Sequence, residues 1–523
     1  MRRRSRRVGL AGVLALMLLA FAAADVGRAE AGNQGGGARL TPALAAAAGH
    51  AWPNELLHVI VAGDGAAAAV ADYGHVRHEL PFSSGVAGTV RSGELQLLAA
   101  QPGVASVALD SPVKLESTGS VSAASLATIY PGRDSAANPW SAGATGQGVG
   151  IAVIDSGVTP SADFGTRLTQ VRLDGQAGSL DDTVGHGTMV AGIAAGYSQS
   201  GKFIGIAPGA TIYAININRP AGVYASDVIT ALKWVFDNAH TYNIRVVNLS
   251  LSETVPSSYR DSPLDLAVER LWAIGVFVAV SAGNLGPGEI DYAPANDPLA
   301  FTVGAFDTMD TSGPGDDRLL PWSSSGKTVD GFAKPDLVAP GRHIASPLPS
   351  GTTLDGQAPS SNRVASGYAT ITGTSFAAPQ VAGAAAIIFQ WHPDYSPDNV
   401  KWALIAKQGS KPKDSKTGSL SLSSSYNYAG APGRANQGVP ALVCGPGTTC
   451  LSDGAVASSW DSSSWNSSSW NSSSWNSSSW NSSSWNAAAD WNSSSWNSSS
   501  WNSSSWNSTS WNSTGSDLFD PWG

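Results

Sequence analysis

The sequence predicts an α/β protein whose main body is a parallel sheet covered by helices on both faces. Between residues 140 and 430, short and nearly continuous apolar runs alternate with helical stretches. Strands that are buried on both faces have this uninterrupted apolar character. The expected strands are Val149–Ile154, Ile212–Ile217, Val246–Leu251, Val276–Val280 and Phe301–Val303. Examples of the expected helices are Gly187–Ala195, Ala225–Ala239 and Ser262–Ala273.

Composition and charge support a large globular core and exclude some partners. Apolar residues make up 42% of the 523 residues and charged residues 13%, which favours a buried core over a disordered chain. The formal charge is -9. Residues 1–31 hold six Arg against Asp25 and Glu30, a local +4, so the remainder carries -13. An acidic, Lys-poor body argues against DNA, RNA or an anionic membrane as the main partner.

Residues 1–31 are predicted to be a signal peptide. A basic start precedes an apolar run, Val8–Ala24, and small residues follow. Cleavage after Ala24 and cleavage after Ala31 both fit the small residues there. Ser5–Leu10 also resembles a twin-arginine signal, although clustered arginines produce that match easily. The alternative is a membrane anchor, for which the apolar run is marginal. We therefore expect a secreted or cell-surface protein.

A small α+β unit is expected ahead of the main body. Residues 32–54 begin with a Gly- and Ala-rich stretch and are expected to be flexible, and residues 116–139 are rich in Ser, Ala and Thr and resemble a linker. Between them, residues 55–115 interleave two short strands with two helices. The expected strands are His58–Val61 and Val104–Leu109, and the expected helices are Ala66–Tyr73 and Gly93–Ala100.

Residues 431–455 are interpreted as a second linker. It contains the only two cysteines, Cys444 and Cys450. In an exported protein the default for such a pair is a small disulfide loop, and two free thiols are the alternative. Two sulfurs alone are too few for a structural zinc site.

Residues 456–523 form a low-complexity tail in which Trp recurs mostly every five residues, as Trp-Asn-Ser-Ser-Ser. A period of five places the Trp side chains on one face of neither a strand nor a helix. The first interpretation is a largely disordered polar segment. A solenoid is a second. A third is an adhesive tail whose Trp rings stack on cell-wall or extracellular polysaccharide.

Three motifs in the main body carry an Asp, a His and a Ser in sequence contexts that suit catalysis. They are Gly150–Val158 with Asp155 after a strand, Gly185–Gly192 with His186 where a loop becomes a helix, and Gly373–Pro379 with Ser375 at a helix start. A hydroxyl is a weak nucleophile and needs a base to take its proton. An imidazole base needs a carboxylate that fixes its tautomer and stabilises its cation. The three residues together predict nucleophilic acyl transfer.

In these motifs the chain resembles the subtilases, the subtilisin-like serine peptidases, whose triad runs in the order Asp, His, Ser. The Asp-Ser-Gly, Gly-His-Gly-Thr and Gly-Thr-Ser-x-Ala-x-Pro blocks occur in that order. A fourth block, Val280–Asn284, resembles the oxyanion-hole segment of the family. The resemblance covers about residues 140–430. It implies a subtilisin-like fold, with Asp155, His186 and Ser375 as the triad and Asn284 as an oxyanion donor.

The resemblance also implies a substrate groove, but with departures from the family pattern. Its walls would include Ser250, Leu251, Ser252, Ala282 and Gly283. Ser252 and Glu253 stand where relatives usually have glycine, and Leu285 stands where many carry an acidic residue. We expect an apolar pocket rim that favours an apolar residue before the cut and weakens selection for Lys.

Further expectations follow from the resemblance. Residues 55–115 resemble the inhibitory pro-segment of the family, which would act as an internal inhibitor alongside protein or peptide substrates. No cofactor is required for catalysis. Structural calcium is a family expectation only, because the acidic stretches Asp181-Asp182 and Asp307–Asp317 lack the spacing of a known calcium loop and are interpreted as solvated surface acids.

The resulting prediction is a secreted serine endopeptidase that is made as a self-inhibited precursor. Two alternatives remain. In one, the peptidase domain is an inactive relative used for binding. In the other, the tail defines a surface- or wall-binding role and the peptidase is its cargo.

Overall fold

The computed structural model describes residues 39–443, except 84, 116–127, 177, 221, 312 and 429, together with the backbone of 449–450. The predicted signal peptide, the Trp-rich tail and Cys444 lie outside the described residues. The predictions for them, including the disulfide, therefore stay predictions. The described residues belong to one compact unit.

The main body contains the predicted sheet. Its strands are β7 (Gly150–Asp155), β8 (Leu168–Val171), β9 (Thr211–Asn216), β10 (Ile244–Leu249), β12 (Phe277–Ser281), β13 (Phe301–Asp307), β14 (Arg318–Leu319) and β17 (Leu337–Pro340). The order is β14-β13-β12-β10-β7-β9-β8, and β17 pairs with β13. All pairs are parallel except β13–β14. The apolar runs therefore form a parallel sheet, as predicted.

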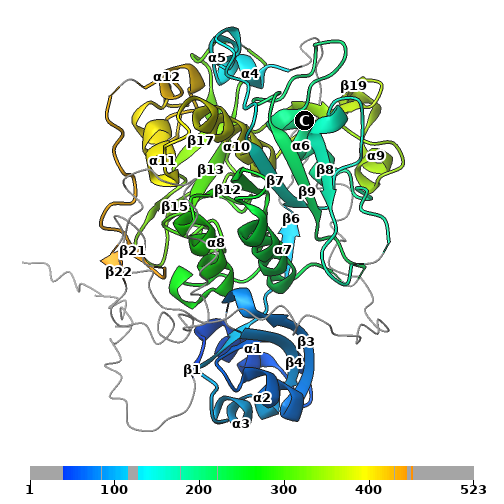
Figure 1. Ribbon diagram of the computed structural model, residues 1–523, viewed down its shortest axis with the longest axis vertical. Coiled ribbons are helices and arrows are strands. Elements are labelled where there is room, and N and C mark those ends of the chain that lie inside the picture. Colours follow the sequence, from blue (N-terminus) through cyan, green and yellow to red (C-terminus); the bar gives the residue numbers. More distant parts are fainter. Residues whose placement is uncertain are drawn as a thin grey trace, which may run out of the picture. The chain divides into compact units, whose positions relative to one another are not determined.

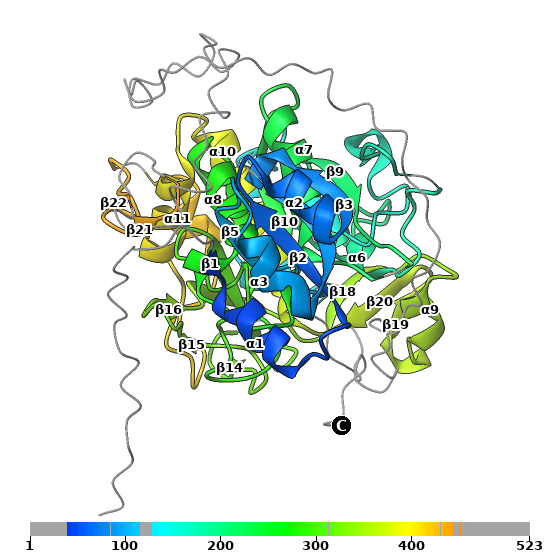
Figure 2. The ribbon, with the colours of Figure 1, turned by 90° about the horizontal axis from the view of Figure 1, so that it is seen from below.

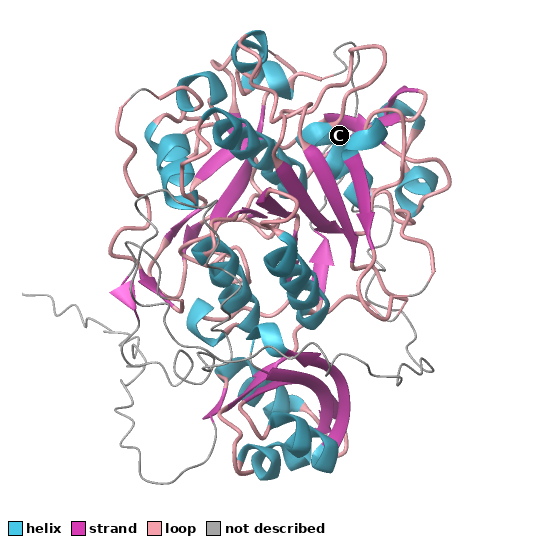
Figure 3. Cartoon of the chain, viewed as in Figure 1, coloured by secondary structure: helices cyan, strands magenta, loops and turns pink. Residues whose placement is uncertain are grey.

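Helices cover both faces of this sheet (Figures 1 and 3). On one face α7 (Ala225–Asn238) packs beside α8 (Pro263–Ala273), and on the other α6 (His186–Ala195) packs beside α10 (Thr374–Trp391). Sixteen of the 18 residues of α10, Thr374 to Phe389, are buried, as its nearly uniform apolar composition requires. None of the helices in the described ranges combines the length and hydropathy needed to cross a membrane.

Shorter elements complete the main body. They are β11 (Leu251–Glu253), β15 (Gly326–Lys327), β16 (Ala333–Lys334), β18 (Ile344–Pro347), α9 (Thr353–Gln357), β19 (Arg363–Ala365), β20 (Tyr368–Ile371), α11 (Pro397–Ala406), α12 (Leu422–Ser425), β21 (Pro440–Ala441) and β22 (Thr449–Cys450). The predicted strand Val246–Leu251 is divided in two, because β10 ends at Leu249 and β11 leaves the sheet to pair elsewhere.

The small amino-terminal domain is a five-stranded sheet with three helices (Figure 2). Its elements are β1 (Arg39–Leu40), α1 (Pro42–His50), β2 (Leu56–Ala62), α2 (Ala66–Tyr73), β3 (Gly74–Leu80), β4 (Gly85–Arg91), α3 (Leu95–Ala99) and β5 (Ser106–Leu109). The strand order is β1-β5-β2-β4-β3. β3 and β4 were not predicted from the sequence: β3 consists mostly of polar residues, and β4 contains two glycines, which are rare in strands.

The two faces of this small sheet pack against different partners. Successive side chains of a strand point to opposite faces. In β2, Val59 and Val61 belong to a core that the domain shares with its own helices. Ile60, which lies between these two valines, and Ala62, which follows them, belong to the core of the main body. Phe82 belongs to the same core. The second face of the small domain is therefore completed by the rest of the chain.

Two segments expected to be flexible are folded. Within residues 32–54, α1 forms because its alanines favour a helix and Pro42 suits the first turn, and Leu44 is fully buried. Within residues 116–139, the described part carries α4 (Tyr130–Arg133) and the start of α5 (Ala137–Ser141). Tyr130 is buried and its hydroxyl donates to the Ile204 carbonyl. Ser- and Ala-rich composition alone therefore misplaced both boundaries.

The carboxyl-terminal boundary of the main body is also later than the predicted residue 430. Asn436, Ala441 and Leu442 are buried, and the Val443 N–H donates to Glu269 at 2.8 Å. The first part of the expected linker 431–455 thus packs on the main core.

Candidate active site

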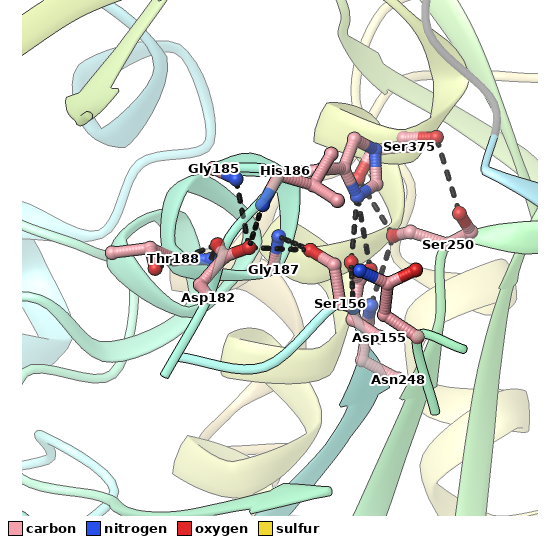
Figure 4. A network of polar contacts seen from close by, with 12 residues as sticks. Asp155, Ser156, Asp182, Gly185, His186, Gly187, Thr188, Asn248, Ser250 and Ser375 are labelled. Carbon is pink, nitrogen blue, oxygen red and sulfur yellow. Dashed lines mark hydrogen bonds and ion pairs between the residues drawn. The ribbon is translucent and has the colours of Figure 1, made fainter. Parts of the chain in front are cut away.

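Asp155 and His186 form the centre of a buried polar network (Figure 4). Asp155 is the last residue of β7, and His186 is the first residue of α6. His186 Nδ1 lies 2.8 Å from Asp155 Oδ1 and 3.0 Å from Oδ2. A carboxylate is an acceptor only, so Nδ1 carries the proton and Nε2 is left as the acceptor. This is the tautomer that a general base requires.

The loop before α6 is fixed by a second carboxylate, Asp182. It accepts hydrogen bonds from the backbone N–H groups of Val184, Gly185 and Thr188, at 2.7 to 3.0 Å. It also accepts from Ser156 Oγ at 2.8 Å, and Ser156 Oγ in turn accepts from the Gly187 N–H at 2.9 Å. Burial raises the pKa of Asp182. The network ties the residues after Asp155 to the turn that carries His186.

Gly187 allows the close approach of α6 to β7. A Cβ atom at this position would lie 2.2 Å from the Gly157 carbonyl oxygen and 3.0 Å from Asp155 Oδ1. No side chain fits that space without moving the backbone. The glycine after His186 is therefore required for the distance between base and carboxylate.

Ser375 lies at the start of α10, where Pro379 leaves the Ser375 carbonyl free to accept a hydrogen bond from outside the helix. In a regular helix the N–H of residue 379 would donate to the carbonyl of residue 375, but Pro379 has no N–H. The Ser375 carbonyl instead accepts from Ser250 Oγ at 2.7 Å. Asn248 Nδ2 donates to the same Ser250 hydroxyl at 2.9 Å. Pro379 thus leaves free a carbonyl that binds the turn carrying Ser375 to the strand segment after β10.

The first turn of α10, which carries Ser375, packs against His186, but no hydrogen bond joins the two residues in the described part of the chain. Ser375 Oγ donates to the Ser250 carbonyl at 3.4 Å. The ring of Phe376, the next residue, lies 5.2 Å from the His186 ring. His186 Nε2 is buried and has no hydrogen-bond partner in the described part of the chain. The free lone pair of Nε2 is available for the proton of a hydroxyl that rotates toward it.

Asn284 is oriented as an amide donor. Its Oδ1 accepts from the Thr374 backbone N–H at 3.1 Å and from Thr374 Oγ1 at 2.9 Å. A backbone N–H can only donate, so this contact fixes which amide atom is oxygen. Asn284 Nδ2 is buried and has no partner among the described residues. Its N–H groups are free to stabilise an oxyanion near Ser375.

The pro-segment candidate enters the predicted substrate groove as a strand. β6 (Val113–Leu115) pairs antiparallel with β11, with Leu115 opposite Leu251 and Val113 opposite Glu253. On the other side of this strand, the Val113 N–H donates to the Val223 carbonyl at 3.0 Å. The strand is therefore bound from both edges, as a peptide added to a sheet is.

The other residues predicted to line the groove are found at or beside β11 and β12. Leu251 and Ser252 lie in β11, and Ala282 follows β12. The Gly283 N–H donates to Thr374 Oγ1 at 3.2 Å, which links the segment to the start of α10. Leu285 is 45% exposed, in agreement with a position at a rim.

Sequence reasoning missed the contact between the small domain and the start of α7. Asp110 Oδ1 accepts from the Ser226 N–H at 3.1 Å, and Oδ2 accepts from Ser226 Oγ at 2.9 Å. Arg77 forms an ion pair with Asp110 at 3.0 Å. Burial raises the pKa of Asp110 to about 6, although the Arg77 charge acts against the shift. No sequence motif marked Asp110, because its hydrogen-bond donor Ser226 is 116 residues away.

The acidic stretches considered for calcium are engaged in protein contacts. Asp182, Asp307 and Asp317 are buried, so the interpretation as solvated surface acids is wrong for them. Asp307 pairs with Arg342 at 2.7 Å, and Asp317 pairs with Arg133. Within the described residues, no group of three or more His, Cys, Asp or Glu could hold a metal ion.

Comparisons with known proteins agree with this geometry. The model of the subtilase family matches residues 146–429. The serine protease AprX of Bacillus subtilis is 36% identical over 274 residues, which cover 50% of this chain but 61% of AprX. Subtilisin Savinase of Lederbergia lenta is 33% identical over 255 residues, which cover 49% of this chain and 81% of that protein.

A structural comparison supports the fold. The crystal structure of fervidolysin from Fervidobacterium pennivorans, a keratinolytic enzyme related to subtilisin, matches with a TM-score of 0.58 at 21% identity. The match covers 75% of this chain and 63% of fervidolysin. At that identity the likeness concerns the fold alone. With more than half of the sequence matched by the family model, the chain belongs to the subtilase family.

Proposed function

We propose that this protein is a serine endopeptidase that is made as a self-inhibited precursor and matures by its own catalysis. The observation that carries the proposal is the arrangement of Asp155, His186 and Ser375 around a groove in which β6 is paired as a strand. The basic start and the apolar run within residues 1–31 support the proposal that the protein is exported.

The reaction begins with Ser375 Oγ attacking the carbonyl carbon of the scissile peptide. His186 Nε2 takes the hydroxyl proton, while Asp155 stabilises the imidazolium through the Nδ1–H contact. The carbonyl oxygen becomes an oxyanion, which accepts from Asn284 Nδ2 and from the Ser375 N–H. In the first turn of α10 that N–H has no helical acceptor.

The tetrahedral intermediate collapses when His186 gives its proton to the leaving amine, which departs with a new N–H bond. The acyl group stays on Ser375 as an ester. A water molecule then attacks this ester, loses a proton to His186, and releases the carboxylic acid and free Ser375. Every proton is exchanged through Nε2, the one nitrogen of His186 that is not engaged by Asp155.

Residues 39–115 would serve as the inhibitory pro-segment in this proposal. β6 occupies the edge of β11, which a substrate strand would need. Ile60, Ala62 and Phe82 place one face of the small sheet in the core of the main body, which gives a reason for tight association. The bond that is cut lies beyond Leu115, outside the described residues.

The preference for an apolar residue before the cut remains part of the proposal. The exposed Leu285 supports it, since an apolar rim favours apolar substrate side chains. A peptide-library profile dominated by Lys or Arg immediately before the cut would sink this part.

The decisive test replaces the nucleophile. Ser375→Ala should abolish casein hydrolysis, with a loss of roughly 10⁴-fold or more, and should accumulate as uncut precursor on a denaturing gel. The wild type should be inactivated by a covalent inhibitor directed at serine. Ser141→Ala, on the surface of α5, is the matched control and should behave as the wild type.

Normal maturation of Ser375→Ala would show that another protease cuts the pro-segment. Full casein hydrolysis by Ser375→Ala would contradict the proposed catalysis itself. Binding of polysaccharide by the Trp-rich tail is a separate prediction. It is tested by comparing the binding of full-length Ser375→Ala and of a tail-truncated form to cell-wall material.

A further inference from the structure

Asn248 is a buried amide that the proposed mechanism does not use. It lies in β10 and is fully buried. In the parallel register of the central sheet it stands opposite Val153, which is two residues before Asp155 in β7. Paired residues of neighbouring strands point to the same face, and so do residues two apart in one strand. The Asn248 side chain therefore faces the same side of the sheet as Asp155 (Figure 4).

The amide of Asn248 donates to Ser250, which in turn donates to Ser375. Asn248 Nδ2 lies 2.9 Å from Ser250 Oγ, and Ser250 Oγ lies 2.7 Å from the Ser375 carbonyl oxygen. A carbonyl oxygen only accepts, so the single proton of the Ser250 hydroxyl points to Ser375. Ser250 Oγ can then only accept from Asn248, which fixes Nδ2 as the amide atom in contact. The three groups form a hydrogen-bonded chain with one direction.

This chain ends on a carbonyl that has no donor inside its own helix, because Pro379 lacks an N–H. A buried carbonyl without a donor costs free energy, and the Ser250 hydroxyl supplies the missing donor. A serine side chain has three staggered rotamers. The hydrogen bond from Asn248 favours the rotamer that reaches Ser375. The donation from Asn248 therefore stabilises the turn that carries the proposed nucleophile.

Ser250 also lies next to the edge that a substrate strand would use. β11 begins at the following residue and pairs with β6. The Ser250 carbonyl lies 3.4 Å from Ser375 Oγ, so both polar groups of Ser250 contact the same residue of α10. The position of Ser375 relative to the edge strand thus depends on Ser250. A misplacement of about 1 Å between reacting groups can lower a rate by about 100-fold.

We propose that Asn248 is a positioning residue of the active site, which acts through the Ser250 hydroxyl to hold the turn of Ser375. The inference rests on the proposed peptidase function. Asn248 Oδ1 is buried and has no partner among the described residues. The donation to Ser250 is therefore the one hydrogen bond that the Asn248 side chain makes within that part of the chain.

The test measures kcat and KM of the processed enzyme, obtained from the full-length chain, on an internally quenched peptide. Asn248→Leu nearly keeps the shape of asparagine but donates no hydrogen bond. It should lower kcat roughly tenfold and change KM by less than about twofold, because the turn of the nucleophile is affected and the edge strand is kept. Circular dichroism verifies that equal amounts of folded enzyme are compared.

Asn296→Leu is the matched control. Asn296 is also fully buried, donates through Nδ2 to the Ser257 carbonyl at 2.7 Å, and has an Oδ1 without a partner among the described residues. This variant loses a comparable buried hydrogen bond that does not lead to Ser375. It should lose stability like Asn248→Leu and keep the wild-type kcat.

Ser250→Ala distinguishes positioning from a general structural role. It removes the hydroxyl and keeps the carbonyl at the edge of the groove. Its kcat should fall at least as far as that of Asn248→Leu. The double variant should be within about twofold of Ser250→Ala, because Asn248 then has no hydroxyl to act through. Two independent structural defects would instead multiply, to a combined loss of roughly 100-fold.

If Asn248→Leu yields no folded enzyme, the smaller Asn248→Ala replaces it in the same comparison, with the same expected order of kcat values. A kcat within about twofold of the wild type, or losses that multiply in the double variant, would overturn the inference and leave the peptidase function intact. A raised KM at unchanged kcat would overturn it as well. Inactivity of the wild type on both the peptide and casein would instead refute the proposed function on which the inference rests.

Discussion

The proposed catalytic centre and the groove edge under the proposed pro-segment differ in how their buried carboxyl groups are hydrogen-bonded. At the centre, Asp155 is fully buried and is engaged by His186 and by the Ser156 N–H at 2.7 Å. Asp182, a few ångströms along the network, accepts five hydrogen bonds. At the groove edge, Glu253 is nearly as buried, yet its carboxyl has no hydrogen bond among the residues that the structure describes.

This difference distinguishes the hydrogen-bonded network around Asp155, which is complete in the precursor, from the environment of Glu253, which changes when the proposed pro-segment leaves. A satisfied carboxylate can stay buried as an anion, and the centre is already assembled while the groove is covered. An unsatisfied carboxyl is tolerable when it is protonated, and it gains hydration when the cover leaves. Inhibition in the proposed precursor therefore blocks access to the site and does not disturb its geometry.

The largest expected effect comes from weakening the packing of the small amino-terminal domain against the main body. Phe82 of the small domain is 1% exposed, and its ring lies 4.9 Å from that of Phe236 on α7. In a Ser375→Ala precursor, which stays uncut, Phe82→Ala should destabilise the chain by roughly 3–5 kcal/mol. Denaturant unfolding measures this loss, and limited proteolysis should release the small domain faster.

The control for this variant is Leu97→Ala, whose side chain is 56% exposed on the same domain. It should change the unfolding free energy by no more than about 0.5 kcal/mol. Equal stability of Phe82→Ala and Leu97→Ala would mean that the small domain does not depend on the main body for its second face.

The proposed catalytic centre is tested by removing Asn284, the proposed oxyanion donor. Asn284→Ala should lower kcat about 10²- to 10³-fold, with little change in KM, because the amide acts on charge that develops only in the transition state. Steady-state kinetics on a quenched peptide measures both constants. Asn138→Ala, exposed on α5, should keep wild-type kinetics. A raised KM at unchanged kcat would assign Asn284 to substrate binding instead.

Much of the main body and its centre could be predicted from the sequence, for physical reasons. The strands of the central sheet are buried on both faces, so β7 and β12 appear as uninterrupted apolar runs. Gly187 is required because α6 approaches β7 closely, and Pro379 leaves the Ser375 carbonyl without a donor inside the helix. Both residues therefore stand in motifs that can be recognised in the sequence. Requirements of this kind involve neighbouring residues and can therefore be recognised in the sequence.

The rest depends on contacts between distant segments. Asp182 was interpreted as a surface acid, because its hydrogen bonds come from a turn whose path only the fold determines. The strand β3 was missed, because Arg77 and His78 are polar residues that the main body covers. Glu253 stood out as a departure from the family, but its place in a cavity needed the register of β6 on β11.

The smallest expected effect is a pH dependence that arises from Asp110, whose pKa burial raises although Ser226 donates two hydrogen bonds to it. Burial raises the pKa of Asp110 to about 6 in the assembled precursor, from an ordinary value of 3.8. The folded state then binds more protons than the unfolded state between these values, so the stability that Asp110 contributes is present below about pH 4 and is lost as pH rises through 6. Asp110→Asn in the Ser375→Ala precursor cannot titrate there.

The difference in unfolding free energy between Ser375→Ala and the double variant should therefore change by on the order of 1–3 kcal/mol from pH 4 to pH 7, as measured by denaturant unfolding at each pH. His58 and His78, whose pKa values burial lowers to about 4, act in the opposite direction, but both remain in the two proteins and largely cancel in the difference. The exposed Asp72→Asn should leave a constant offset. Parallel stability curves for Asp110→Asn would contradict the prediction and would show that burial does not raise the pKa of Asp110 in the precursor.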